Sequence, residues 1–160
     1  RHYTVAEYEA LIARLRSRID GLTVSTDLIL GFPGETEALF EETMETLKRL
    51  NFSHIHAFPY SPRKGTPAAT MSGQIDTAEK KRRVELVNEL SARQKAALLE
   101  SLVGTKASVL IETQEGTEGE GFTGNYERVA VKGLPEGSQR TVVSVALVGT
   151  DGKKLLAEAL

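Results

Sequence analysis

Residues 23–35 read TVSTDLILGFPGE, and this stretch decides the fold class of the first part of the chain. An apolar strand, predicted over residues 22–30, runs directly into a Gly-Phe-Pro-Gly turn and then Glu35. In parallel α/β folds, ligands bind in the crevice beyond the carboxyl end of a strand. We therefore expect a binding edge at Gly31–Glu35. Four residues of the strand are expected to be largely buried: Val24, Leu28, Ile29 and Leu30.

Helices are predicted on both sides of this strand. Thr4 and Glu7 have the spacing of a capping box, and apolar residues then recur at helical spacing until Gly21. Thr36 is predicted to cap a second helix, which has Phe40 on its apolar face.

A second strand is predicted over residues 54–60. The order helix, strand, helix, strand implies parallel pairing through right-handed crossovers. Two strands cannot close a barrel or cover both faces of a sheet. Residues 1–60 are therefore expected to form half of an α/β domain whose other half lies outside this sequence.

The remaining sequence predicts a loop, a long helix and a small β-barrel. Residues 61–73 are rich in Pro, Gly, Ser and Thr, which is typical of a loop. A long helix is expected from Asp76 or Thr77 to just before Gly104, after which the hydrophobic period changes from 3.6 to 2. Short strands are predicted at residues 106–112, 128–132, 140–148 and 155–160, with a glycine-rich loop at 115–124. The predicted domains are residues 1–75, 76–103 and 104–160.

The composition limits the classes of site. The 160 residues include no cysteine, which excludes disulfides and thiolate-based iron–sulfur or zinc sites within them. The histidines His2, His54 and His56 lack the spacing of metal ligands. The net charge of −2 does not indicate a dedicated nucleic-acid binder, but residues 60–103 carry eight basic and five acidic side chains. No apolar run approaches the ~20 residues that span a bilayer, so we expect a soluble, cytoplasmic protein without a membrane partner.

Three motifs in a fixed order resemble one protein family. They are STDLILGFPGET, PYSPRKGTPAA and, after the long helix, GFTGNYERV. Together they resemble the C-terminal part of the radical-S-adenosylmethionine methylthiotransferases, over essentially all 160 residues. The resemblance implies an α/β plus all-β fold: the C-terminal half of a parallel (β/α) barrel, a linking helix and an antiparallel β-barrel of the TRAM type. The segment FSHIHAFPYSPRKGTPAA is most similar to the branch that methylthiolates threonylcarbamoyladenosine beside the tRNA anticodon.

The resemblance implies a radical reaction on tRNA. In the family, one [4Fe–4S] cluster cleaves S-adenosylmethionine to a 5′-deoxyadenosyl radical, and a second cluster supplies sulfur. Upstream cysteines hold both clusters, and this sequence has none. We therefore expect the chain to hold no metal and to be inactive by itself.

The resemblance places S-adenosylmethionine beside the fifth barrel strand and the loop that follows it. The residues that match this region are Asp27, Leu28, Ile29, Gly31, Phe32, Pro33, Gly34 and Glu35. Glycines let the main chain approach a ligand closely, and Pro33 stiffens the turn. A structural interpretation stays open, in which Leu28 and Ile29 are core residues and Gly31 and Gly34 only shape a strand-to-helix turn. In the same interpretation Asp27 makes a structural hydrogen bond and Glu35 is a helix-start carboxylate.

A second set of residues is expected to contact tRNA: Tyr60, Arg63, Lys64, Phe122, Tyr126, Arg128 and Lys132. Cations bind phosphates, and aromatic rings stack on unpaired bases. The family branch that modifies a ribosomal protein carries acidic residues where Arg63 and Lys64 stand, so the basic pair favours RNA. The alternatives are that Arg63 and Lys64 are solvated loop charges and that Phe122 and Tyr126 plug the end of the barrel.

Two further groups are assigned structural roles. Residues 80–83, Lys-Lys-Arg-Arg, point around most of a helix and predict a solvated helix start rather than an RNA-binding patch. His54 and His56 share a strand face that could line the barrel interior, and we expect core or hydrogen-bonded rather than catalytic histidines.

Two other functions stay open at this point. The chain could be a non-catalytic RNA-binding module that uses its α/β part as a scaffold. It could also belong to a radical-S-adenosylmethionine methylthiotransferase that acts on a ribosomal protein. Whatever its function, the exposed strand edges of a half-barrel make a dimer of the chain possible.

Overall fold

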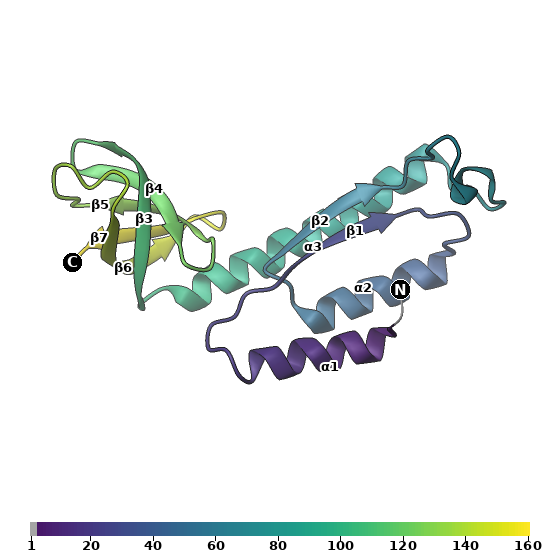
Figure 1. The fold of residues 1–160 in the computed structure, drawn as a ribbon, viewed down its shortest axis with the longest axis horizontal. Helices are drawn as coiled ribbons and strands as arrows, with labels where there is room; N and C mark the ends of the chain where they lie inside the picture. Colours follow the sequence, from purple (N-terminus) through teal and green to yellow (C-terminus); the bar gives the residue numbers. More distant parts are fainter. Residues whose placement is uncertain (1–2) are drawn as a thin grey trace. The chain divides into compact units, whose positions relative to one another are not determined.

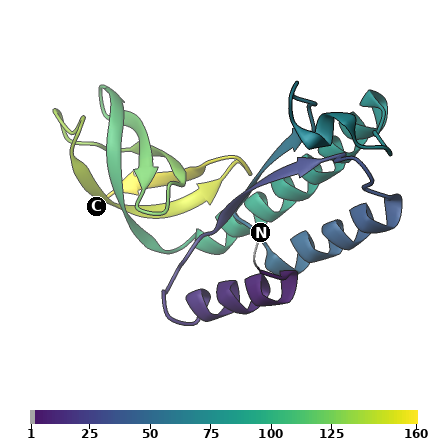
Figure 2. The same ribbon diagram turned by 45° about the vertical axis from the view of Figure 1, so that its right-hand side comes forward.

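The computed structural model describes residues 3–160, so His2 lies outside the described residues. The chain forms two compact units, of which the first ends at Gln94 and the second runs from Lys95 to Leu160. Figure 1 labels the elements, and Figure 2 shows them from a second side. The boundary falls inside helix α3 (Thr77–Leu102), so the domain limits predicted from the sequence stay a prediction.

The first unit is a two-stranded parallel sheet covered by helices. Its elements are α1 (Val5–Arg16), β1 (Ser25–Leu30), α2 (Glu37–Leu50), β2 (His54–Pro59), the short 3₁₀ helix η1 (Pro67–Thr70) and the first part of α3. Strands β1 and β2 pair in parallel, with Ser25 opposite His54 and Leu30 opposite Pro59. The predicted order and the parallel pairing are therefore confirmed.

Side-chain caps explain where the helices begin. The Thr4 amide donates to the Glu7 carboxylate at 2.7 Å, and the Glu7 amide donates to Thr4 Oγ1 at 3.2 Å, which is the predicted capping box. Thr36 Oγ1 accepts from the amide of Leu39 at 3.3 Å, as a helix cap does. Helix α1 ends at Arg16, however, earlier than the stop predicted at Gly21.

The core of the first unit lies on one face of the sheet. Leu30 and Ile55 are buried there against helices α2 and α3, and the buried helix residues are Phe40, Leu47, Leu50, Val87 and Leu90. The prediction that Ile29 is buried is wrong, because it is 58% exposed, and Val24 and Leu28 are only partly buried. Successive strand residues point to opposite faces, and the described helices cover one face only.

The second unit is a closed five-stranded barrel. Its strands are β3 (Lys106–Glu115), β4 (Glu118–Thr123), β5 (Arg128–Lys132), β6 (Val142–Thr150) and β7 (Leu155–Ala159), in the order β3-β4-β5-β7-β6. The predicted small barrel is confirmed, with two corrections. Residues 115–124 are not a loop, since most of them form the β3–β4 hairpin. The barrel is also not wholly antiparallel, because β5 and β7 pair in parallel.

Inward-facing apolar residues fill this barrel. Buried residues alternate with more exposed ones in the central parts of β3, β5, β6 and β7, as in Val109 and Ile111 of β3, and Leu99 of helix α3 joins the same core. Lys95 on the same helix forms an ion pair with the buried Glu127. No helix within residues 3–160 has the length and apolarity that crossing a bilayer would require.

Candidate functional site

The loop that follows β1 has the backbone geometry that its glycines allow. Gly31 and Gly34 adopt φ angles of +72° and +87°, in the left-handed region that favours glycine. The Glu35 amide donates to the carbonyl of Phe32 at 2.9 Å, which closes a tight turn. The Gly34 amide donates to the carbonyl of Gly73 at 2.9 Å, so the segment before α3 also holds this loop.

Glu35 folds back onto the loop and does not act as a helix-start carboxylate. Its Oε1 accepts a hydrogen bond from the Gly31 amide at 3.0 Å, at the first residue after the strand. The side chain of Thr36 caps helix α2 instead. The structural alternative considered for Glu35 is therefore wrong, and its carboxylate fixes the shape of residues 31–35.

Two basic residues of α3 are buried against this loop, contrary to the prediction that residues 80–83 form a solvated helix start. Arg83 is 3% exposed and donates to Glu35 Oε1 at 2.6 Å and to the Glu35 carbonyl at 2.9 Å. Lys80 is 9% exposed, and its ammonium lies 5.4 Å from the centre of the Tyr60 ring. Helical spacing could have indicated that Lys80 and Arg83 are buried. These two residues lie one helical turn before Val84 and Val87 and so continue the apolar stripe of α3.

Glu79 joins α3 to the same group of charges. Hydrogen bonds from Arg82 and then Arg83 lower the pKa of Glu79 to about 2. Arg82 Nη2 also donates to both carboxylate oxygens of Glu37, each at 2.8 Å, so α2 and α3 are tied together at this end.

The lowered pKa of Glu79 predicts a pH-dependent stability. A carboxyl whose pKa is lower in the folded state stabilises the fold above its unfolded pKa, and this stabilisation is lost as pH falls through the folded pKa. Because folding lowers this pKa from 4.5 to about 2, the loss falls in that pH interval. We expect Glu79→Gln to flatten the fall in unfolding free energy over this interval, as measured by urea unfolding at several pH values. Glu89→Gln, whose exposed pair with Arg93 is 4.0 Å long, is the control and should leave the slope unchanged.

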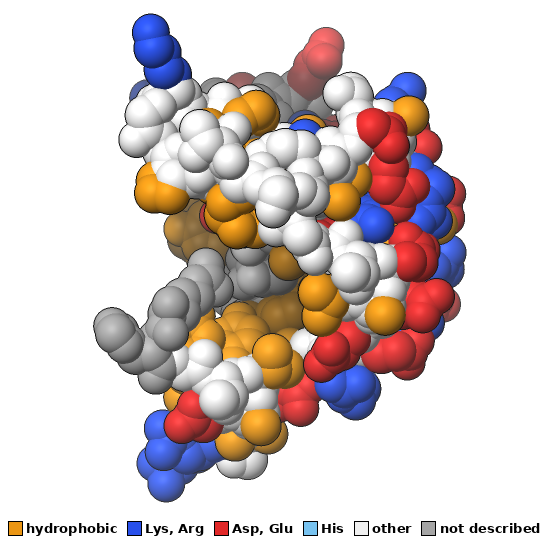
Figure 3. Space-filling model, turned by 90° about the vertical axis from the view of Figure 1, so that its right-hand side faces the viewer, with side chains coloured by type: hydrophobic (Ala, Val, Ile, Leu, Met, Phe, Trp, Pro, Cys, Tyr) orange, Lys and Arg blue, Asp and Glu red, His pale blue; other side chains and the backbone are white. Residues whose placement is uncertain are grey.

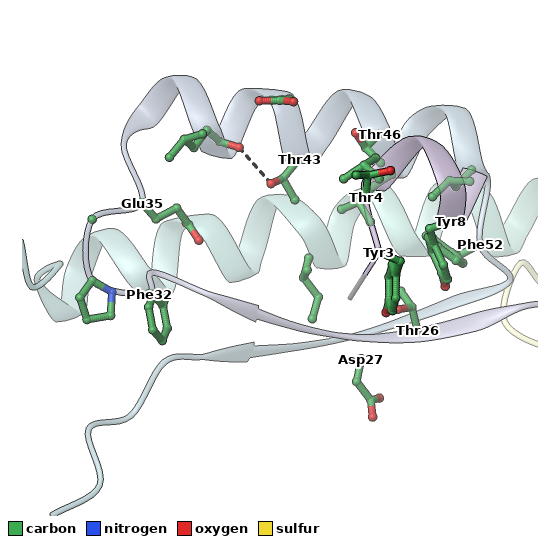
Figure 4. A pocket seen from close by; sticks show the side chains of 18 residues that line it. Tyr3, Thr4, Tyr8, Thr26, Asp27, Phe32, Glu35, Thr43, Thr46 and Phe52 are labelled. Carbon is green, nitrogen blue, oxygen red and sulfur yellow. Dashed lines mark hydrogen bonds between the residues drawn. The ribbon is translucent and has the colours of Figure 1, made fainter. Parts of the chain in front are cut away.

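The face of the sheet opposite the helices carries three cross-strand pairs. Ser25 is in register with His54, Asp27 with His56, and Ile29 with Phe58. All six residues are exposed, and the rings of His54 and His56 lie 4.2 Å apart. The prediction that the two histidines share one strand face is confirmed, and the interpretation that they are core residues is wrong, because both are exposed. Figure 4 shows Asp27 projecting from the side of the strands away from the helices.

Aromatic rings meet where the two strands end. Tyr60 follows β2, and its amide donates to the carbonyl of Leu30 at 2.7 Å. Its ring packs edge-on against Phe32, with the centroids 5.2 Å apart. Phe32 remains 42% exposed, whereas Pro33 is buried, so the loop presents an aromatic surface on a fixed backbone. The Tyr60 hydroxyl is buried and has no hydrogen-bond partner within residues 3–160.

A cavity of about 650 Å³ runs along the edge of β1 that pairs with no other described strand. It is lined by Thr26 and Leu28 of β1, by Thr43 and Thr46 of α2, and by the Phe32–Glu35 loop. Figure 4 shows Tyr3 and Tyr8 near Thr26. In the same view Phe32 lies at the other end of the strand. Figure 3 views the molecule from the end toward which β1 and β2 point, and it shows a hollow with hydrophobic side chains visible inside.

Arg63 and Lys64 lie in the exposed loop that follows Tyr60. Neither side chain forms an ion pair with any residue of the described chain. The loop is shaped by Thr66, whose amide and hydroxyl donate to the Arg63 carbonyl at 3.1 and 2.8 Å. The predicted cations are therefore available to an anionic partner.

The two candidate RNA-binding cations of the barrel, Arg128 and Lys132, stand at opposite ends of β5, and carboxylates compensate the charge of each. Phe122 is in register with Arg128, and Arg128 binds the Glu120 carboxylate at 2.5 Å. Hydrogen bonds from Lys154 and then Arg128 hold the pKa of Glu120 below its usual value. Lys132 lies 3.6 Å from Glu118.

Tyr126 does not plug the barrel. It adopts a φ of +60° and is 85% exposed, so that alternative is wrong for Tyr126, while Phe122 is partly buried. The ring of Tyr126 is therefore accessible to a partner.

Comparison with known proteins gives several relatives of known family. The chain is 46% identical over 124 residues to the tRNA-2-methylthio-N(6)-dimethylallyladenosine synthase of Moorella thermoacetica, which covers 78% of the chain and 28% of that protein. It is 38% identical to the protein of the same name from Chromobacterium violaceum, over 100% of the chain and 36% of the relative. A "Probable threonylcarbamoyladenosine tRNA methylthiotransferase" of Methanocaldococcus jannaschii is 39% identical over 89% of the chain and 32% of its own length.

The chain thus spans about a third of the length of these relatives. No protein-family model matches it. Relatives of both substrate names occur at similar identity, so the branch suggested by residues 52–69 stays a prediction. The resemblance seen in the three motifs is confirmed at the level of the family. The chain belongs to the tRNA methylthiotransferase family.

Proposed function

We propose that the chain is the part of a tRNA methylthiotransferase that faces the bound nucleoside and contacts the RNA. One observation carries this proposal. The Gly31–Glu35 loop is fixed at the carboxyl end of the parallel strand β1, and the face of β1 that the helices do not cover is exposed. In this proposal residues 1–75 and helix 76–103 complete a (β/α) barrel, and residues 104–160 form a TRAM-type domain. Work on tRNA would place the protein in the cytoplasm.

The residues of the loop suit S-adenosylmethionine as a ligand. Gly34 is exposed and has no side chain to hold a ligand away from the main chain. Ile29 and Phe32 offer exposed apolar surface to an adenine ring, and the Asp27 carboxylate can accept hydrogen bonds from hydroxyl groups. When bound, S-adenosylmethionine supplies the radical chemistry of the reaction.

The residues of this chain do not suit an iron–sulfur cluster. Such clusters are held by cysteine thiolates, and the sequence has no cysteine. Within residues 3–160 there is also no group of three or more His, Cys, Asp or Glu side chains placed to hold a metal ion. In the proposed enzyme, residues outside this sequence hold both [4Fe–4S] clusters.

Two sites on the chain are proposed to contact tRNA. Arg63 and Lys64 supply uncompensated positive charge for phosphates, and Tyr126 supplies an exposed ring for stacking. Tyr60 is proposed to support the site of Arg63 and Lys64 indirectly, because its ring packs against the ring of Phe32. Arg128 and Lys132 already bind carboxylates, so they reach phosphates only by leaving Glu120 and Glu118.

Nucleoside analysis of tRNA tests the proposed function. Deletion of the complete reading frame that encodes this chain should remove one methylthiolated adenosine from total tRNA digests examined by mass spectrometry. The complementing gene should restore it. The lost nucleoside identifies the substrate as the dimethylallyl or the threonylcarbamoyl derivative. Unchanged tRNA together with a lost modification on a ribosomal protein would contradict the proposal.

Arg63 and Lys64 should contribute to tRNA affinity through phosphate contacts. Each such contact adds about 0.7–0.9 to the slope of log affinity against log salt concentration. We expect the double variant Arg63→Ala/Lys64→Ala of the complete protein to lower this slope by about 1.4–1.8 in tRNA titrations. The matched control is Lys81→Ala/Arg93→Ala, which removes two exposed basic residues of helix α3. Equal slopes for the two double variants would contradict a role of residues 63 and 64.

A further inference from the structure

Arg83 is a buried cation with all of its nitrogens engaged. Nη1 donates to Glu35 as described above, Nε donates to Glu79 Oε1 at 2.7 Å, and Nη2 donates to Glu37 Oε2 at 3.3 Å. Only 4% of its side chain is exposed. Since no nitrogen points into open space, Arg83 is not placed to touch a ligand of the loop.

Arg82 binds two of the same carboxylates, those of Glu79 and Glu37, but forms no hydrogen bond with residues 31–35 of the described chain. Its side chain is 46% exposed, and its hydrogen bonds go to Glu79 and Glu37. The two neighbouring arginines therefore share the contact between α2 and α3. They differ in one respect, which is that Arg83 also holds Glu35.

Glu35 connects Arg83 to Gly31, the first residue of the loop. Its Oε1 accepts from both the Gly31 amide and Arg83, at 3.0 and 2.6 Å. The guanidinium also grips the backbone carbonyl of Glu35. Arg83 consequently fixes both ends of the five-residue segment 31–35, and the Gly34–Gly73 bond fixes its middle.

A loop held in this way presents its exposed groups in one arrangement. Phe32 stands at the tip, packed on Tyr60 and partly exposed. Groups that are fixed before a ligand arrives cost less conformational entropy when the ligand binds. The part of the molecule that fixes this loop belongs to helix α3, whose sequence lies about fifty residues further along the chain.

We propose that Arg83 is a positioning residue, which holds the Gly31–Glu35 loop in its ligand-binding shape by orienting the Glu35 carboxylate. The identity of the ligand, S-adenosylmethionine, rests on the function proposed above. Arg83 acts through Glu35 and Gly31 and does not contact the ligand. The loop shape itself is a property of this chain and can be measured without a ligand.

The first test measures the loop. In the complete protein, Arg83→Met should increase deuterium uptake of peptides that cover residues 31–35, whereas Arg82→Met should not. Glu35→Gln, which leaves Arg83 with Glu79 and Glu37, should increase uptake in the same peptides. Unchanged uptake in both the Arg83 and the Glu35 variants would overturn the proposal. An equal increase in the Arg82 and Arg83 variants would also overturn it, since it would indicate a general loosening of α3.

The second test measures the ligand. Arg83→Met should raise the KM for S-adenosylmethionine about tenfold in the cluster-loaded enzyme, with the KM for tRNA and the cluster absorption spectrum unchanged. Arg83→Lys should recover part of this loss, because an ammonium reaches Glu35 but lacks the planar fork. A parallel rise in both KM values, or the same KM for S-adenosylmethionine in the Arg82 and Arg83 variants, would overturn the proposal. If the unmodified protein binds no S-adenosylmethionine, the proposed function fails, and the deuterium uptake still decides whether Arg83 positions the loop.

Discussion

Replacement of Gly121 by alanine is expected to unfold the β-barrel. Gly121 lies on β4 opposite Ile111, where the register of β3 shifts between Ile111 and Thr113. A Cβ atom at this position would overlap the carbonyl oxygen of Leu110 and lie 2.8 Å from its carbonyl carbon and 3.0 Å from Ile111 Cα. All three atoms belong to the backbone, so no rotation of a side chain can relieve the clash.

The expected cost is more than about 3 kcal/mol, at or above the usual range for overpacking a core. Net stabilities run at roughly 0.05–0.15 kcal/mol per residue, so this cost is a large part of what a barrel of this size has. Urea unfolding followed by circular dichroism measures the loss. Gly124→Ala is the control, because a Cβ there meets nothing within 4 Å and the backbone φ is not positive. We expect the control to change stability by less than about 0.5 kcal/mol. Equal effects of the two substitutions would show that β3 and β4 do not approach as closely as described.

Replacement of Gly31 by alanine is expected to damage the first unit and its candidate site together. At a φ of +72°, a residue with a Cβ costs about 1–2 kcal/mol more than glycine. The added Cβ would also overlap Cγ of Lys80 and lie 3.2 Å from its Cδ. Lys80 is buried beside Tyr60, so its stem has little room to move. Overpacking of this kind adds about 1–3 kcal/mol.

Gly34→Ala separates the two contributions to this effect. Gly34 also has a positive φ, of +87°, but a Cβ there meets nothing within 4 Å. We expect this variant to lose only the backbone term of about 1–2 kcal/mol, and Gly31→Ala to lose about 2–5 kcal/mol. Thermal and urea unfolding of the two variants measure the difference. If Gly34→Ala were as destabilising as Gly31→Ala, the contact with Lys80 would not be the cause.

The candidate site was predicted in part. The turn at Gly31–Gly34 and the exposed cations Arg63 and Lys64 were identified from residue types that have few other uses in those positions. The resemblance places Glu35 beside S-adenosylmethionine, and its residue type offered a helix-start carboxylate as the alternative, yet its carboxylate accepts from the amide four residues earlier. The resemblance to TRAM domains predicts Arg128 and Lys132 as RNA contacts, and nothing in the sequence indicates that Glu120 and Glu118 lie across the sheet from them.

Features that depend on neighbouring residues were fixed by the sequence alone. The capping box of Thr4 and Glu7, the strand-to-helix turn after Leu30 and the alternation of the barrel strands follow from local hydrogen bonds and from hydrophobic period. These interactions join residues only a few positions apart, so a linear pattern contains them.

Only the tertiary structure decided which charges are buried and which apolar residues are exposed. Arg83 is buried because three carboxylates, contributed by the α2 entry and by α3, surround it, while Ile29 is exposed because helices cover the other face of its strand. Burial of a charge depends on partners that are distant in sequence, and burial of an apolar side chain depends on which face of the sheet is covered. Helical spacing places residues 80 and 83 on the apolar stripe of α3, but no local pattern specifies the carboxylates of Glu35 and Glu37 that make burial of Arg83 possible.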